Sequence, residues 1–192
     1  MTKGRLEAFS DGVLAIIITI MVLELKVPEG NDWQSLKPLI PKFLAYIFSF
    51  LYVGIYWNNH HHLFQTVKKV NGKVLWANLH LLFWLSLMPF ATEWIGGTHF
   101  AKNPVATYGF GLGLCAIAYT ILENAIIKSE GESSKLKQAI ASRFKENASI
   151  VLYVSGIIVS FIYPYIAVAL YYTVALLWLI PDRRIEKTLN EN

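Results

Sequence analysis

The sequence contains little charge and a single cysteine. Only 16% of its 192 residues are Asp, Glu, Lys or Arg, whereas soluble domains carry about 25%. Cys115 alone excludes an intramolecular disulfide and a zinc site built from several cysteines. The chain also lacks a phosphate-binding glycine loop, a nucleophile elbow, an HExxH motif and a basic-aromatic surface. It therefore offers no enzyme active site and no nucleic-acid interface.

Long apolar runs take the place of these features. The chain is 55% hydrophobic, with a mean hydropathy of +0.43, and about 20 apolar residues suffice for a helix to cross a bilayer. We predict an all-α integral membrane protein that forms one domain over residues 1–192. Its six expected spans are 6–25, 41–65, 74–94, 105–127, 148–163 and 165–179. The last two divide one apolar block at Pro164 and are short for full spans.

The distribution of basic residues predicts an orientation. If both termini lie in the cytoplasm, only Lys26, Lys37, Lys42 and Lys102 of the 17 Lys and Arg residues lie outside. Such a bias is typical of cytoplasmic loops. We expect the first helix to be retained, because no small-residue cleavage site follows it. A short surface helix is expected after Ser134, and we find no internal repeat.

The stretch from Arg5 to Lys26 is apolar from Val13 to Leu23 except for Thr19. An apolar stripe with one hydroxyl runs along this helix at helical spacing. The stripe consists of Ile16, Thr19, Ile20 and Leu23. Such a stripe is usually core packing, and spacing alone assigns it no other role. Asp11 lies about 140° around the helix from Ile16. A carboxylate at membrane depth needs partners and is a candidate functional group.

Polar residues on the next two helices lie at the same depth as Ser10 and Asp11. They are His60, His61, Asn78 and His80. Two interpretations stay open: a network that fixes helix packing, and a proton or ion relay. We expect no metal site and no cofactor, because consecutive histidines such as His60 and His61 point about 100° apart on a helix.

Several motifs in the first half resemble a known family. They are RxxxFSDGV at 5–13, AIxxT at 15–19, WNNHH at 57–61, LWxNL at 75–79 and LMPF at 87–90. Together they look like the transmembrane protein 175 family of potassium channels over about residues 5–95. The later helices match that family in hydropathy and length only.

The resemblance implies a homotetramer in the cell membrane, with both termini cytoplasmic and four copies of the first helix around a central pore. It implies a pore constriction and gate at Ile16, Ile20 and Leu23, and a selectivity layer of hydroxyl groups at Thr19. It also implies a polar network that holds the first helix, for which we expect Arg5, Phe9, Ser10, Asp11, His60, His61 and Asn78. No TVGYG-type filter is present.

The leading hypothesis is a passive, moderately selective potassium channel whose partners are the bilayer, permeant K⁺ and further copies of itself. A proton-coupled transporter that uses Asp11 with His60 and His61 is the alternative. A structural membrane subunit without transport is a further alternative, disfavoured by the hydroxyl group in the stripe.

Overall fold

The computed structural model describes residues 2–68, 70–131 and 143–179, and these stretches are helical with short connections. The helices are α1 (Lys3–Leu23), the 3₁₀ helix η1 (Trp33–Leu39), α2 (Ile40–Gln65), α3 (Gly72–Ser86), α4 (Met88–Gly97), α5 (Lys102–Glu130), α7 (Phe144–Ser160) and α8 (Pro164–Leu179). The prediction of an all-α membrane protein is confirmed. The surface helix expected after Ser134 lies outside the described residues.

Four stretches are long and apolar enough to cross a membrane. They are α1, η1 with α2, α3 with α4, and α5. Helix α1 has 21 residues, which at about 1.5 Å per residue matches a hydrocarbon core of about 30 Å. Helix α8 is apolar but has only 16 residues. Residues 161–163 separate α7 from α8 immediately before Pro164.

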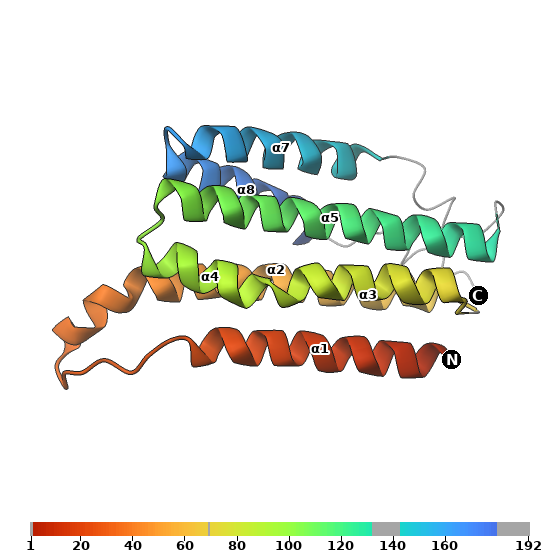
Figure 1. Cartoon of the computed structure of the whole chain (residues 1–192), viewed down its shortest axis with the longest axis horizontal. Helices are drawn as coiled ribbons and strands as arrows, with labels where there is room; N and C mark the ends of the chain where they lie inside the picture. Colours follow the sequence, from red (N-terminus) through yellow and green to blue (C-terminus); the bar gives the residue numbers. More distant parts are fainter. Residues whose placement is uncertain (1, 69, 132–142, 180–192) are drawn as a thin grey trace.

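The third expected span, 74–94, is interrupted in the structure. Helix α3 ends at Ser86 and α4 begins at Met88. Pro89 has no N–H to donate, and its ring crowds the carbonyl group four residues earlier, so the helix cannot continue regularly. At this point the Leu87 amide bonds the Trp84 carbonyl at 3.2 Å, a 3₁₀-type bond. The two helices still follow one another as a single rod (Figure 1).

Side chains and prolines define the helix starts. The Asp32 carboxylate accepts a hydrogen bond from the Ser35 amide at 3.0 Å and caps η1. Pro41 then occupies the first turn of α2, where its missing N–H costs nothing. The Asn71 side chain caps α3 by accepting from the Val74 amide at 3.0 Å.

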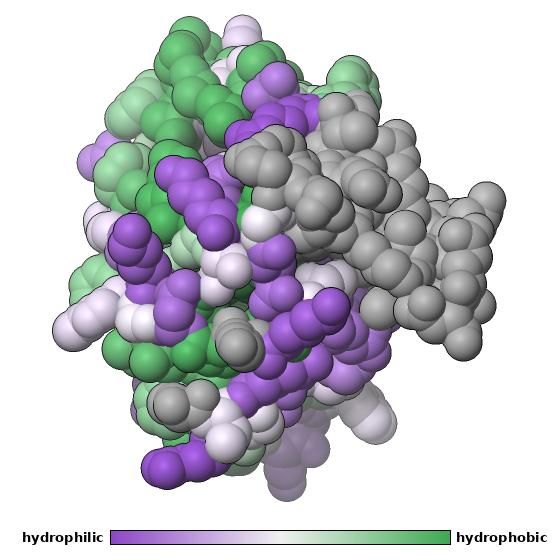
Figure 2. All heavy atoms as spheres, turned by 90° about the vertical axis from the view of Figure 1, so that its right-hand side faces the viewer, coloured by the Kyte–Doolittle hydropathy of each residue, from purple (hydrophilic) through white to green (hydrophobic). Residues whose placement is uncertain are grey.

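The helices run side by side, with α1 along one edge of the bundle (Figure 1). Helix α1 packs on α2, α3 and α4, whereas α5 packs on α3, α4, α7 and α8. The N terminus lies at the same end as the last turn of α5. Figure 2 looks at that end and shows many polar residues there, with apolar residues on the flank. This distribution suits a bundle whose sides face lipid.

One buried tyrosine joins the helices of the second half. Tyr171 of α8 is 1% exposed, and its hydroxyl group donates to the Val105 carbonyl at 3.3 Å. Its own carbonyl accepts from Tyr52 of α2. A Cβ atom added at Gly109 would lie 2.0 Å from the Tyr171 hydroxyl oxygen, and one at Gly156 would lie 2.4 Å from its ring. The two glycines therefore make room for this side chain.

Candidate functional site

Helix α1 has one buried face and one exposed face. Its buried residues recur every three or four positions and pack against the neighbouring helices; they are Leu6, Ser10, Leu14, Ile17 and Met21. On the other side Ile16 is 60% exposed and Leu23 is 69% exposed. Ile20 and Phe9 are also exposed. The stripe predicted from the sequence therefore lies on the face that the rest of the subunit leaves uncovered.

Thr19 adds a hydroxyl group to this exposed face. Its Oγ1 donates to the Ala15 carbonyl at 2.8 Å, which fixes the side chain against its own helix. The bond uses the hydroxyl proton and leaves the oxygen lone pairs free to accept a hydrogen bond or to contact a cation. Among apolar neighbours such as Ile16 and Ile20, this oxygen is a polar site that α1 can offer on that face.

Three of the predicted network residues bind one another inside the bundle. Asn78 Nδ2 donates to Ser10 Oγ at 3.0 Å, and Ser10 Oγ donates to the Leu6 carbonyl at 2.9 Å. His60 Nε2 lies 2.7 Å from Asn78 Oδ1; since an amide oxygen only accepts, the imidazole is the donor. All three side chains are buried. Directional bonds thus tie α1 to α3, and α3 to α2.

Asp11 lies outside this network. Its side chain is exposed, and its Oδ1 accepts from Trp57 Nε1 at 3.0 Å. His61 is also exposed and pairs with Gln65 on its own helix at 2.9 Å. In the described part of the chain no hydrogen bond joins Asp11 to His60 or His61. The structure therefore joins Ser10, His60 and Asn78 by hydrogen bonds, whereas Asp11 and His61 bond to other side chains.

The other two predicted network residues, Arg5 and Phe9, lie on the exposed side of α1. Trp57, by contrast, is a partner of Asp11 that sequence reasoning missed. The signal that could have indicated it is its place directly before Asn58 and the histidines in the WNNHH motif. Within residues 2–68, 70–131 and 143–179, no group of three or more His, Cys, Asp or Glu side chains is placed so that it could hold a metal ion.

Together, the apolar helices, the buried polar network and the uncovered edge helix define a multi-pass α-helical membrane protein. The family model described as "Endosomal/lysosomal potassium channel TMEM175" matches residues 5–89. A potassium channel of Chryseobacterium sp. (strain P1-3) is 79% identical over 192 residues, the whole of both chains. The chain therefore belongs to the TMEM175 family, which is a family of ion channels and not of enzymes.

More distant relatives carry two different names. A potassium channel of Chamaesiphon minutus is 33% identical over 153 residues, which is 76% of this chain and 74% of that one. The endosomal/lysosomal proton channel TMEM175 of Mus musculus is 35% identical over 116 residues, which is 54% of this chain but 23% of that one. The crystal structure of a lysosomal potassium-selective channel TMEM175 homolog from Chamaesiphon minutus superposes with a TM-score of 0.79 at 27% identity, covering 94% of this chain and 97% of that one.

Proposed function

We propose that this chain is a potassium channel that conducts passively through a pore lined by α1 from four subunits. The observation that carries the proposal is the apolar stripe of α1, in which Ile16 is 60% exposed although it is close to the middle of a membrane span. Relatives named potassium channels support the choice of ion. Four copies of α1 around an axis would cover the stripe and enclose a path across the membrane.

Each level of the stripe has a distinct proposed role. Four Ile16 side chains form the narrowest ring, which closes by size and by loss of water. Ile20 and Leu23 extend this apolar gate towards the other end of the helix. Isoleucine offers no oxygen to a cation, so the Thr19 hydroxyl groups, nearby backbone dipoles and retained water supply the preference for K⁺. We expect the selectivity to be moderate for that reason.

The polar residues hold the pore helix in its place. Ser10, His60 and Asn78 fix the buried face of α1 against α2 and α3. On the exposed side of α1, Asp11 accepts a hydrogen bond from Trp57 of α2. Arg5, Phe9 and His61 are exposed in the isolated subunit and are proposed to contact neighbouring subunits in the tetramer. The distribution of basic residues supports a cell membrane location with both termini in the cytoplasm.

The transporter alternative is less well supported. A relay through Asp11, His60 and His61 needs these groups in contact or joined by water. Asp11 is bonded to Trp57, and His60 is bonded to Asn78. The relatives are named channels. A flux assay with an imposed pH gradient separates the two: uphill solute movement driven by protons would favour the transporter. The same assay measures proton permeation, which matters because the mouse relative is named a proton channel.

The test of the pore compares two asparagine substitutions on one helix. In liposomes, Ile16→Asn is expected to increase K⁺ flux and to lower the preference for K⁺ over Na⁺, because an amide lets water and ions through the ring. Val22→Asn is the matched control: Val22 is also exposed, but lies about 120° around the helix from Ile16. Flux and selectivity like those of the wild type in Ile16→Asn would refute the constriction. The oligomeric state in detergent is a second test. A monomer would have no central pore and would contradict the proposed tetramer.

A further inference from the structure

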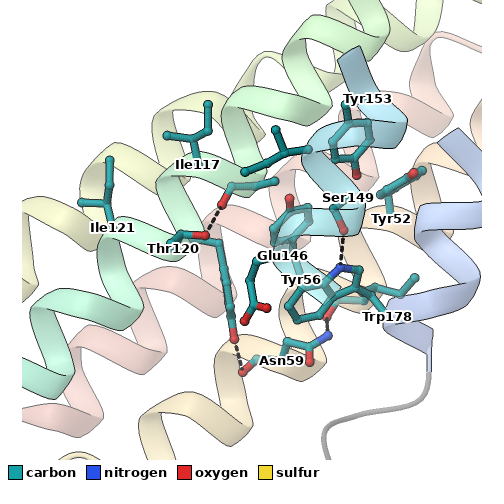
Figure 3. Close-up of a pocket in the computed structure, with 14 residues that line it drawn as sticks. Tyr52, Tyr56, Asn59, Ile117, Thr120, Ile121, Glu146, Ser149, Tyr153 and Trp178 are labelled. Carbon is teal, nitrogen blue, oxygen red and sulfur yellow. Dashed lines mark hydrogen bonds between the residues drawn. The ribbon is translucent and has the colours of Figure 1, made fainter. Parts of the chain in front are cut away.

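A cavity lies between α2, α5, α7 and α8, away from the exposed face of α1. Its volume is about 250 Å³, and Figure 3 shows the side chains that line it. Five aromatic residues and one carboxylate account for its chemistry: Tyr52, Tyr56, Tyr119, Tyr153, Trp178 and Glu146. A small cavity with apolar walls and one charged group is the usual form of a site for a small molecule.

The carboxylate of Glu146 has a hydrogen-bonding capacity that its neighbours do not use. Glu146 lies in the first turn of α7. Its Oε2 is buried and accepts no hydrogen bond from the described part of the chain. Figure 3 shows the side chain among the lining residues. A buried charged oxygen without a donor is costly, and such atoms in native proteins call for an explanation.

Three donors that line the cavity with this carboxylate take part in other hydrogen bonds. The Tyr119 hydroxyl group donates to the Asn59 carbonyl at 3.2 Å, and Trp178 Nε1 donates to Ser149 Oγ at 2.9 Å. The Thr120 hydroxyl group donates to the Ala116 carbonyl at 3.0 Å. These three bonds use the protons of the Tyr119, Trp178 and Thr120 side chains, so none of them donates to Glu146, and an N–H group of a bound molecule would supply the missing donor.

One wall of the cavity faces the side of the bundle. Ile117, Ile121 and Ile150 line it and are each 44–49% exposed. They lie on α5 and α7, so this wall of the cavity lies towards the lipid phase. A molecule that enters from this side has to be lipophilic.

We propose that this cavity binds a lipophilic primary amine in its ammonium form, with an N–H group donating to Glu146 and the hydrocarbon part among the tyrosine rings. Charge-assisted hydrogen bonds to a carboxylate are the stronger kind, and aromatic faces attract cations. Lys145 lies beside the site, since its Nζ is 5.6 Å from the centre of the Trp178 ring. Its positive charge repels the ammonium group of the bound amine. The site lies within one subunit and does not depend on the pore proposed for α1.

The test compares two molecules of the same shape on the purified full-length protein. The probes are 2-phenylethylammonium and propylbenzene, in which a methyl group replaces the ammonium group. Calorimetric titration gives the ratio of their dissociation constants, and comparing this ratio between variants removes the effect of partition into detergent micelles. Glu146→Gln is expected to lower the preference for the amine at least tenfold, and Lys145→Gln is expected to raise it.

Two further variants serve as controls. Glu29→Gln removes an exposed carboxylate from the loop before η1 and should leave the ratio unchanged. Ala116→Phe fills the cavity and should weaken both probes. An unchanged ratio in Glu146→Gln, or wild-type binding in Ala116→Phe, would refute the site. If Glu146→Gln does not fold, an unchanged ratio in Lys145→Gln has the same meaning. Loss of channel activity with intact amine binding would count against the proposed function alone.

Discussion

Helix α1 and the group formed by α5, α7 and α8 are packed in different ways. Helix α1 buries one row of side chains and is joined to α3 by the bond between Ser10 and Asn78. The second group closes around Tyr171, which fits between Gly109 and Gly156. Small residues let membrane helices approach closely, and close approach gives dispersion contacts along the whole interface.

This difference indicates what each region needs from outside the subunit. Tyr171 packs against Gly109 and Gly156 of the same chain. Helices α5, α7 and α8 can therefore pack together before subunits assemble. Helix α1 is buried on one side only and keeps an apolar face with Thr19 uncovered. A helix of this kind is suited to contact other copies of itself. The predictions below test this contrast, beginning with the largest expected effect.

Gly109→Ala should destabilise the second region most. The added methyl group would lie 2.0 Å from the Tyr171 hydroxyl oxygen, so the buried ring would have to move. Overpacking of this kind costs about 3 kcal/mol. We expect a large fall in the yield of folded protein and in its melting temperature in detergent. Gly113→Ala is the control, because its methyl group would make an ordinary contact at 3.9 Å.

The clash can be assigned to the Tyr171 side chain by a double-mutant cycle. Tyr171→Leu removes the hydroxyl oxygen and the ring carbons that would lie 2.2 and 2.7 Å from the added methyl group, so Gly109→Ala should cost less in that background than alone. If the two changes were simply additive in free energy of unfolding, the contact between Gly109 and Tyr171 would not be the cause.

Ile16 and Ile17 are adjacent and should respond in opposite ways. Ile17 is 2% exposed and Ile16 is 60% exposed. Ile17→Ala should lower the free energy of unfolding by about 2 kcal/mol, because it leaves a cavity against α2–α4. Ile16→Ala should leave the stability of the subunit nearly unchanged and alter K⁺ flux. Denaturation in detergent and flux in liposomes measure the two effects. Equal losses of stability would mean that α1 has no free face.

Asn78→Ala should cost less than Ile17→Ala but should act on three helices. It removes the donor to Ser10 and the acceptor of His60, and leaves the imidazole N–H buried without its partner. An unsatisfied buried group costs about 1–2 kcal/mol. Ser10→Ala should cost less, since Ser10 is also bonded to the Leu6 carbonyl on its own helix. The reverse order in melting temperature would show that Asn78 is not the centre of the network.

Much of the fold could be predicted from the sequence, because hydropathy and proline positions act locally. Apolar runs gave the helices, and Pro164 marked the division between α7 and α8. Pro89 lies within the third expected span, 74–94, yet its interruption of that helix was not predicted. The packing of Tyr171 against Gly109 and Gly156 could not be predicted from the sequence, because it joins residues far apart in the chain and depends on the distance between helices.

The candidate site was predictable in its residue types and less so in its contacts. Equal depth in the membrane suggested that Ser10, Asp11, His60 and Asn78 would meet. Depth alone does not define the direction around the helix axis, and the structure directs Asp11 to Trp57 and Ser10 to Asn78. The cavity around Glu146 had no local sequence signal, because its walls come from four helices.

Trp57→Phe should have the smallest effect of the series. It keeps the ring but removes the N–H group that donates to Asp11 Oδ1 at 3.0 Å. Because both side chains are exposed in the subunit, water can replace the bond, and the loss of stability should stay below about 1 kcal/mol. Asp11→Asn should be similar, and the double variant should add nothing to either change. Any larger effect should appear in the stability of the oligomer, measured by mass in detergent. If both single variants instead destabilised the monomer as strongly as Asn78→Ala, Asp11 would act together with the buried network of Ser10, His60 and Asn78. The division of α1 into one face packed against the subunit and one uncovered face would then be wrong.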